Sequence, residues 1–241
     1  MSFSQFFVLQ VIAHLLADFI FQNEKNAEDK NKHGFRSKFL ITHVFIVFVL
    51  SWIASLQLNF IWGALAISVL HGLTDGFKSK FYSTHGYFRK YLFFIDQTLH
   101  ILFLFSIVSL YKEFCVFDPI YKFAINQREL LIVAAYLFCA KPYNIVLKEL
   151  LKLFDVNFLS KSEEKDRELQ NAGKLIGIIE RWLVLTFVLV NKYEAVGFLL
   201  AAKSILRYKD VETIRTEYVL IGTMLSFGVA IALGIGIGLL S

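Results

Sequence analysis

The chain has 241 residues, of which 56% are hydrophobic and 16% aromatic, and its formal net charge is +5. Soluble domains average about 45–50% apolar residues, and the excess here is gathered in blocks near the roughly 20 residues that cross a bilayer. This composition excludes an ordinary soluble domain. Most lysines and arginines lie between the blocks, which fits the positive-inside rule better than a nucleic-acid-binding surface. Cys115 and Cys139 have no CxxC partner, so neither a disulfide framework nor a thiolate zinc site is indicated.

The apolar blocks predict an all-α fold, a polytopic transmembrane helix bundle of about eight (7–8) segments. The expected segments are 3–22, 39–55, 60–77, 91–110, 130–151, 175–190, 195–206 and 218–240. Pro142 predicts a kink in the fifth segment, and the seventh is short enough to be a re-entrant helix. Residues 1–7 carry no Lys or Arg, so we expect the first segment to be a retained helix and not a cleaved signal peptide.

The charges of the connections predict the orientation. Four connections rich in Lys and Arg are expected on the cytoplasmic side, namely 23–38, 78–90, 152–174 and 207–216. The opposite connection 56–59 has no basic residue and 191–194 has only Lys192, whereas 112–128 has three and is the exception. The N-terminus is therefore predicted outside, with the protein in the bacterial cytoplasmic membrane. A natural division is an N-terminal four-helix bundle, residues 1–111, and a C-terminal bundle, residues 112–241.

Three short motifs in the first hundred residues each place an imidazole and a carboxylate four residues apart. On a helix the two side chains then share one face. The motifs are His14-x-x-x-Asp18, His71-x-x-x-Asp75 and Asp96-Gln97-x-x-His100. His43 lies in the remaining apolar segment of this half. Burial of ionisable groups in hydrocarbon is unfavourable by several kcal/mol unless they are paired or bind a metal, so these motifs indicate a site within the bundle.

Helices that alternate in direction bring these groups to one layer, roughly 5–15 Å below the cytoplasmic surface. The set contains four imidazoles and three carboxylates: His14, Asp18, His43, His71, Asp75, Asp96 and His100. Such ligands suit Zn²⁺, and less specifically Mn²⁺ or Fe²⁺. Either two ions are bound, or one ion is bound and one of Asp18, Asp75 or Asp96 stays free as a general base. The residues expected to orient the ligands by hydrogen bonds are Gln22, Gln97, Ser68 and Thr74.

Two other interpretations of these groups remain open. In the first interpretation, the carboxylates only fix the histidine tautomers by hydrogen bonds, and the metal is bound by histidines alone. In the other, the groups are packing contacts between helices without a ligand. In the second half, Arg181, Lys203 and Arg207 are candidates to hold an anionic headgroup, or else pair with Glu180 or extend to the membrane interface.

At these motifs the sequence resembles a bacterial family of small polytopic membrane proteins of unknown function. The stretches that carry the resemblance are His14-Leu-Leu-Ala-Asp18-Phe-Ile-Phe-Gln22, His71-Gly-Leu-Thr-Asp75 and Asp96-Gln97-Thr-Leu-His100, with Gly177-Ile-Ile-Glu180-Arg181 and 197–207 in the second half. More distantly, the paired His/Asp helices are similar to those of membrane-bound metal-dependent hydrolases and zinc-dependent phospholipase C. This resemblance implies phosphodiester cleavage, although the chain lacks the N-terminal Trp ligand of the soluble enzymes.

The expected function is a metal-dependent hydrolase that acts at the inner leaflet on a lipid or membrane-tethered (phospho)ester. A bound metal polarises a phosphoryl or acyl oxygen and activates water. The main alternative is a divalent-metal or proton-coupled transporter or channel, which also uses intramembrane His and Asp. A conduit needs polar groups on both sides of the membrane midplane, whereas the motifs keep them in the inner half. A third reading is a non-catalytic assembly protein, and self-association into a homo-oligomer is compatible with all three.

Overall fold

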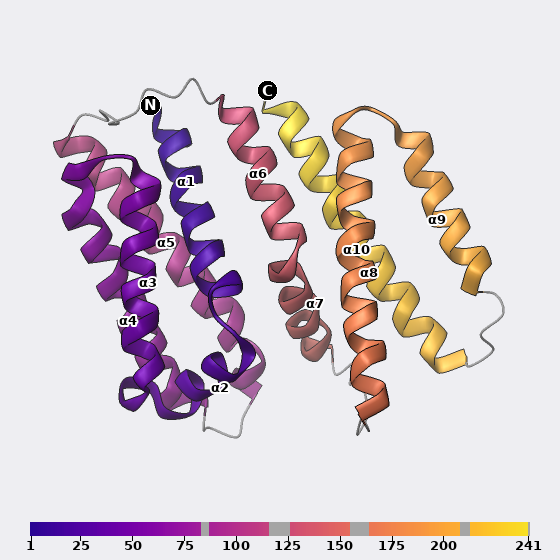
Figure 1. Ribbon diagram of the computed structural model, residues 1–241, viewed down its shortest axis with the longest axis horizontal. Helices are drawn as coiled ribbons and strands as arrows, with labels where there is room; N and C mark the ends of the chain where they lie inside the picture. The colour runs from indigo at the N-terminus through magenta and orange to yellow at the C-terminus, as the bar shows by residue number, and fades with distance from the viewer. Residues whose placement is uncertain (83–86, 116–125, 155–163, 208–212, 241) are drawn as a thin grey trace. The chain divides into compact units, whose positions relative to one another are not determined.

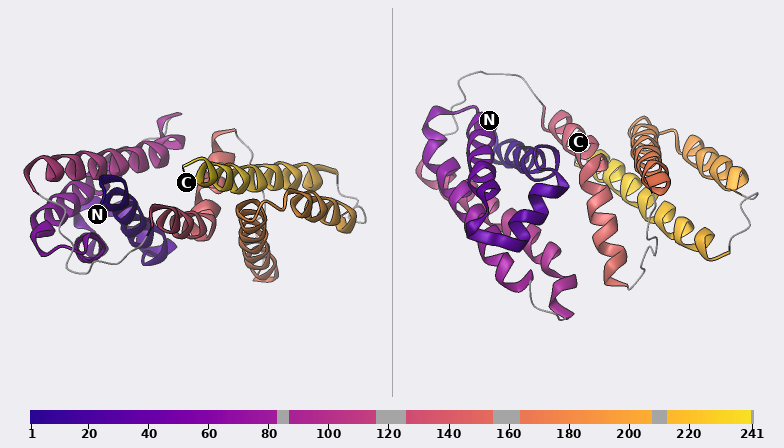
Figure 2. Two further views of the ribbon diagram at one scale, coloured as in Figure 1. Left: turned by 90° about the horizontal axis from the view of Figure 1, so that it is seen from above. Right: turned by 60° about the horizontal axis from the view of Figure 1, so that its bottom comes forward.

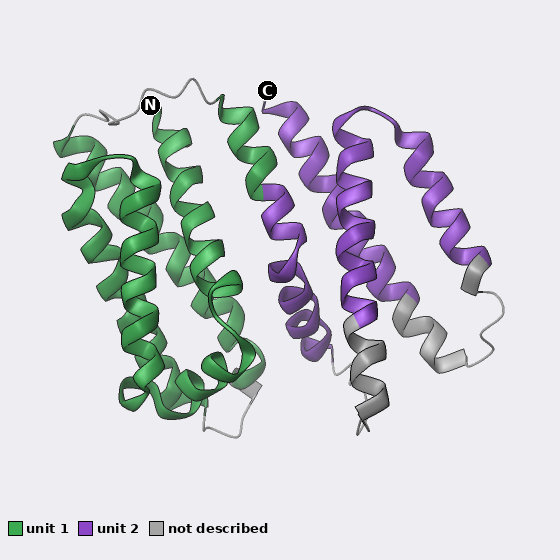
Figure 3. Cartoon of the chain, viewed as in Figure 1, with its two compact units in different colours: residues 1–134 green, residues 135–241 purple. Residues whose placement is uncertain are grey.

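The computed structural model describes residues 1–82, 87–115, 126–154, 164–207 and 213–240, and within these it leaves the side chains of residues 87–88, 164–171, 206–207 and 213–219 undescribed. The described residues form ten α-helices and no strand, which confirms the all-α prediction (Figure 1). Five of these helical stretches are long and apolar enough to cross a membrane, or six if a bent pair counts as one span. The chain divides into two compact units, Met1–Ala134 and Ala135–Ser241 (Figure 3).

Unit 1 is built around four long helices. They are α1 (Phe3–Leu15), α3 (Lys38–Ser55), α4 (Ile61–Tyr82) and α5 (Leu92–Phe114). Both α1 and α4 contact α3 and α5, so the four helices form a closed ring, and Figures 1 and 2 show them grouped in each view. Toward the start of α1 the centre of this ring is apolar, with Phe6, Phe60 and Val108 fully buried. Toward its end, the predicted polar groups face inward.

A π-helical turn, Leu16–Ile20, continues α1 and contains Asp18. The sequence predicted a regular helix to residue 22. A π turn widens the helix locally and is found most often at functional sites, because it reorients the side chains that it carries.

The prediction of a charged loop at 23–38 is wrong, because most of this stretch is helix α2 (Glu24–His33). Asn23 caps the helix start by accepting a hydrogen bond from the Asn26 amide at 2.8 Å. In Figure 1, α2 lies at the lower end of unit 1. It contacts α3 and α4 there, at the end of the ring where the polar groups gather.

The turn after α2 is held tightly against α4. Gly34 has φ +52°, a conformation that favours glycine, and an added Cβ would lie 2.1 Å from the Ser79 hydroxyl and 2.8 Å from the Gly76 carbonyl. At Gly76 an added Cβ would meet the Phe35 ring at 2.3 Å. Two glycines therefore allow the turn to seat on α4, and this contact fixes where α2 lies.

Unit 2 contains the helices of the second half. They are α7 (Lys141–Leu153), α8 (Glu164–Leu189), α9 (Tyr193–Arg207) and α10 (Thr213–Leu239), preceded by α6 (Gln127–Cys139), within which the unit boundary falls. α8 contacts α7, α9 and α10. The kink expected at Pro142 is present as a 53° break between α6 and α7. Each of the eight expected segments coincides with a helix or with this bent pair, while the number that crosses the membrane and the division at 111/112 stay predictions.

Candidate metal centre

Close packing of α3 on α4 brings the first two histidines together. Gly72 makes this possible, because an added Cβ there would lie 2.6 Å from Val44 Cγ2. His43 precedes Val44 and His71 precedes Gly72, so the two histidines lie beside this close contact. The Nε2 atoms of His43 and His71 lie 2.9 Å apart, and both residues are buried.

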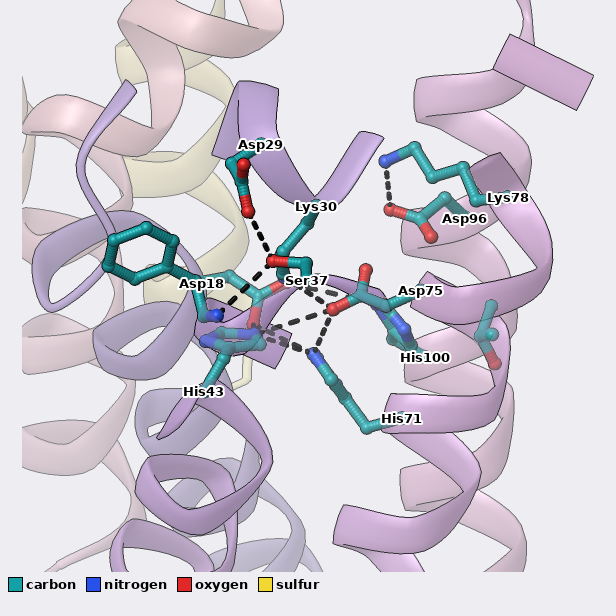
Figure 4. Close-up of polar contacts among 12 residues, drawn as sticks. Asp18, Asp29, Lys30, Ser37, His43, His71, Asp75, Lys78, Asp96 and His100 are labelled. Carbon is teal, nitrogen blue, oxygen red and sulfur yellow. Dashed lines mark hydrogen bonds and ion pairs between the residues drawn. The ribbon is translucent and has the colours of Figure 1, made fainter. Parts of the chain in front are cut away.

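Two carboxylate oxygens, from Asp18 and Asp75, lie close to the Nε2 atoms of both imidazoles, as Figure 4 shows. Asp18 Oδ1 lies 3.3 Å from His71 Nε2 and 3.4 Å from His43 Nε2. Asp75 Oδ2 lies 3.5 Å from His71 Nε2 and 3.6 Å from His43 Nε2. A tetrahedral zinc ion with bonds of about 2.0–2.1 Å separates its ligand atoms by about 3.3–3.4 Å. These four imidazole–carboxylate separations are close to those of a tetrahedral site, whereas the 2.9 Å between the two Nε2 atoms is shorter. Asp18 is not in the same set of mutually close ligand atoms as His43 and Asp75, so the four atoms are not themselves arranged as a tetrahedron.

Asp18 also faces the two remaining histidines. Its Oδ1 lies 3.7 Å from His14 Nδ1, and its Oδ2 lies 3.8 Å from His100 Nδ1. The rings of His71 and His100 stack at 3.8 Å between centroids with an interplanar angle of 9°. The structure thus brings all seven predicted groups together in three overlapping sets whose ligand atoms lie within 4.8 Å: His14, Asp18, His71 and His100; His43, His71 and Asp75; Asp75, Asp96 and His100.

Several of these buried atoms have no hydrogen-bond partner among the described residues. They include Asp18 Oδ1, Asp96 Oδ1 and both ring nitrogens of His100, a side chain that is only 2% exposed. Buried polar atoms are nearly always hydrogen-bonded, because burial without a partner is unfavourable by about 1–3 kcal/mol. A bound metal ion would provide the missing partner for such converging oxygen and nitrogen atoms.

Gln97 connects two of the motifs, as the sequence analysis expected of an orienting residue. Its Oε1 accepts from His14 Nε2 at 3.2 Å, and its Nε2 donates to Asp18 Oδ2 at 3.3 Å. When the His14 Nε2–H donates to Gln97, His14 Nδ1 carries no proton and its lone pair faces Asp18. This is the tautomer that a metal ligand needs.

The other expected orienting residues are placed differently. Ser68 and Thr74 donate to the carbonyls of Leu65 and Leu70 on their own helix, so a role in orienting the ligands stays a prediction for both. Gln22 is half-buried beyond the end of the π turn.

Two lysines belong to the cluster and were missed from the sequence. Lys30 of α2 is 5% exposed and forms an ion pair with Asp75 Oδ2, and Lys78 Nζ donates to Asp96 Oδ2 at 2.8 Å (Figure 4). The signal for α2 was present in Asn23 before the helix, Gly34 after it and the Glu28–Lys32 spacing. Lys78, assigned to a connection, lies within α4, which extends to Tyr82.

Two of the three predicted anion-binding residues of unit 2, Arg181 and Lys203, have contacts of their own. Arg181 is 1% exposed and donates to the carbonyls of Cys139 and Ala140 at the α6–α7 break, and to Asn144 Oδ1. Lys203 forms an ion pair with Glu180, which the sequence offered as the alternative to anion binding. The side chain of Arg207 lies outside the described residues. Anion binding by these three residues stays a prediction.

Comparison with known proteins identifies a family and no function. No curated protein and no solved structure matches the chain. The distant resemblance to metal-dependent hydrolases therefore stays a prediction. Residues 6–132 match the family described as "Protein of unknown function (DUF3307)", and this stretch contains all seven ligand candidates and both lysines. Because the match covers more than half of the chain, the protein belongs to the DUF3307 family.

Proposed function

We propose that the chain is a membrane-embedded, metal-dependent hydrolase that cleaves a lipid or membrane-tethered (phospho)ester from the cytoplasmic side of the bacterial inner membrane. The observation that carries this proposal is the convergence of two imidazoles and two carboxylates, from His43, His71, Asp18 and Asp75, with imidazole–carboxylate separations of 3.3–3.6 Å. Two imidazoles and two carboxylates suit Zn²⁺, with Mn²⁺ or Fe²⁺ less specific. When bound, such an ion supplies Lewis-acid chemistry and activates water.

The proposal includes the eight-span, N-outside topology predicted from the loop charges. In this orientation α2 and the polar end of unit 1 face the cytoplasm, and the cluster lies within reach of inner-leaflet headgroups. The five or six apolar candidate spans support a multi-pass protein, and we assign the shorter or more polar α8 and α9 to the membrane as well.

The remaining groups have roles in this scheme. Asp96 Oδ1 has no partner among the described residues and lies with Asp75 and His100 in one of the three ligand sets, so Asp96 is our candidate general base. A cavity of about 10 Å³, the space of about one water molecule, borders His14, His71 and His100. His14 and Gln97 hold Asp18 in position.

A transporter remains the main alternative, and the packing of unit 1 argues against a through-going path. Gln10 and Ser51 line the cavity and form a buried pair, in which the Ser51 hydroxyl donates to Gln10 Oε1 at 2.6 Å. Phe6, Phe60 and Val108 are fully buried toward the start of α1 and fill the ring there. Such an apolar layer favours a site that opens on one side only.

The test is hydrolysis by the full chain in lipid nanodiscs, with phosphatidylglycerol and bis(4-nitrophenyl) phosphate as probes. We expect turnover that a chelator abolishes and added Zn²⁺ restores, and that is lost in His71→Ala. His33→Ala is the matched control, because His33 lies on α2 with a 59% exposed side chain. Turnover that persists without metal contradicts the proposal. Zinc flux into liposomes without turnover favours the transporter.

A further inference from the structure

Two of the three carboxylates in the cluster already have a cationic partner. Lys30 pairs with Asp75 and Lys78 with Asp96, whereas Asp18 has histidines and Gln97 around it. Lysine almost never occurs buried unless it is paired, and a 6% exposed Lys30 side chain beside a 6% exposed carboxylate is such a case. Both ammonium groups are therefore components of the cluster and not solvated surface charges.

The charge balance limits how many metal ions the cluster can hold. Three carboxylates against two ammonium groups leave one net negative charge. One divalent ion turns this into one net positive charge, and a second would raise it to three. Inside a membrane, an uncompensated charge is strongly disfavoured, so the first ion is accommodated far more readily than the second.

We infer that the Lys30 ammonium group is the built-in second cation of this centre, so that the bundle holds one metal ion and not two. This inference rests on the proposed metal centre and decides between its one-ion and two-ion forms. Lys30 sits on the carboxylate that two of the three ligand sets share, Asp75. A second ion bridging Asp75 and Asp96 would lie beside both ammonium groups, which repel it.

The position of Lys30 is imposed by the packing of α2. The Gly34 turn seats on Gly76 and Ser79 of α4, and Asp29 accepts a hydrogen bond from the Ser37 hydroxyl at the start of α3. These contacts hold α2 on both sides of Lys30, so its side chain reaches Asp75 as a fixed part of the fold. Lys32, two residues further on, instead pairs with Glu28 on the exposed face of α2.

The experiment is zinc titration of the purified full chain in detergent, with bound metal counted by elemental analysis. We expect one equivalent in the wild type and in Lys30→Arg, which keeps the positive charge. Lys32→Met is the control and should also bind one equivalent, because the Lys32 side chain is 56% exposed and pairs with Glu28 outside the cluster. We expect Lys30→Met to bind a second equivalent, because it frees Asp75 Oδ2 as a ligand and lowers the net charge of the two-ion cluster from three to two positive charges. Lys78→Met provides the same test at Asp96, if Lys30→Met does not fold.

The outcomes separate this inference from the metal centre itself. One equivalent in the wild type and two in Lys30→Met support it, as do two in Lys78→Met where Lys30→Met does not fold. Two equivalents in the wild type overturn it while leaving the metal centre in place, and so does a single equivalent in both Lys30→Met and Lys78→Met. No bound zinc in the wild type overturns both proposals.

Discussion

Each unit buries a cluster of polar and charged groups between apolar helices, and the two clusters differ in how their atoms are satisfied. In unit 2, the Arg181 guanidinium donates to two backbone carbonyls and to Asn144, and it stacks on the Tyr143 ring at 4.8 Å. In unit 1, Asp18 Oδ1 and both nitrogens of His100 have no hydrogen-bond partner among the described residues, although each is surrounded by other donor or acceptor groups.

This difference separates a structural contact from a candidate binding site. The break between α6 and α7 leaves carbonyls without helical partners, and Arg181 satisfies them. Its burial is thus explained within the chain. The unit 1 cluster leaves several buried polar atoms without a hydrogen-bond partner among the described residues, as the proposed metal centre requires. Substitutions in the two clusters should therefore have different consequences, for stability in one and for metal binding in the other.

The largest expected effect is in unit 1, from Asp18→Asn. This change keeps the shape of the side chain but removes the carboxylate that faces all four histidines. Zinc affinity should fall by more than the roughly 10–100-fold that loss of an orienting partner causes. Competition with a chromogenic chelator measures it. An affinity equal to that of the wild type would remove Asp18 from the ligand set.

Arg181→Met is the corresponding change in unit 2. It leaves the Cys139 and Ala140 carbonyls without their donor, at about 1–3 kcal/mol for each buried acceptor that finds no other partner. Thermal unfolding in detergent should show the loss of stability, with zinc content unchanged. Loss of zinc together with an unchanged unfolding temperature would contradict the distinction between the two clusters.

Gln97→Ala sharpens the comparison within unit 1, because it removes the residue that orients His14 and Asp18 but no ligand. Zinc affinity should fall roughly 10–100-fold, less than in Asp18→Asn. The same chelator competition orders the two variants. If Gln97→Ala is the weaker binder of the two, the assignment of ligand and orienting roles is reversed.

The smallest effect concerns the attachment of α2. The hydrogen bond from Ser37 is the main cause that lowers the pKa of Asp29 below its ordinary value of 3.8, with a smaller contribution from His33. Because the pKa is lowered in the folded state, the contact stabilises the fold fully above the unfolded-state pKa of 3.8. This stabilisation is lost as the pH falls through the lowered pKa of the folded state. Asp29→Asn should slightly increase amide hydrogen exchange in α2 at neutral pH, and this difference should vanish in acid. A difference that grows in acid would contradict the assignment.

The helices of this fold were predictable because most of the apolar blocks are long and are separated by polar connections. The meeting of the seven groups was also predictable, since helices of alternating direction bring residues near the same end of the bundle to one layer. The π turn at Asp18 was not, because a π turn has no period in the sequence. Nor was the role of Lys30, because α2 has no apolar face, and only its contacts with α4 show that one of its lysines turns inward.

Unit 2 shows the same limit in another form. Pro142 indicated where the helix breaks, but a break does not specify which residue satisfies the freed carbonyls. Arg181 is about forty positions away in sequence, and only the packing of α8 brings it there. A buried arginine therefore looked like an anion site from the sequence, although its donors are already used.

X-ray absorption at the zinc edge of the purified, zinc-loaded chain tests the central claim most directly. We expect imidazole scattering from His43 and His71, together with oxygen from Asp18 and Asp75, at about 2.0–2.1 Å and four ligands in all. His71→Ala should remove one imidazole from this spectrum. A six-oxygen shell without imidazole, or a chain that retains no zinc at all, would contradict the metal centre on which this account depends.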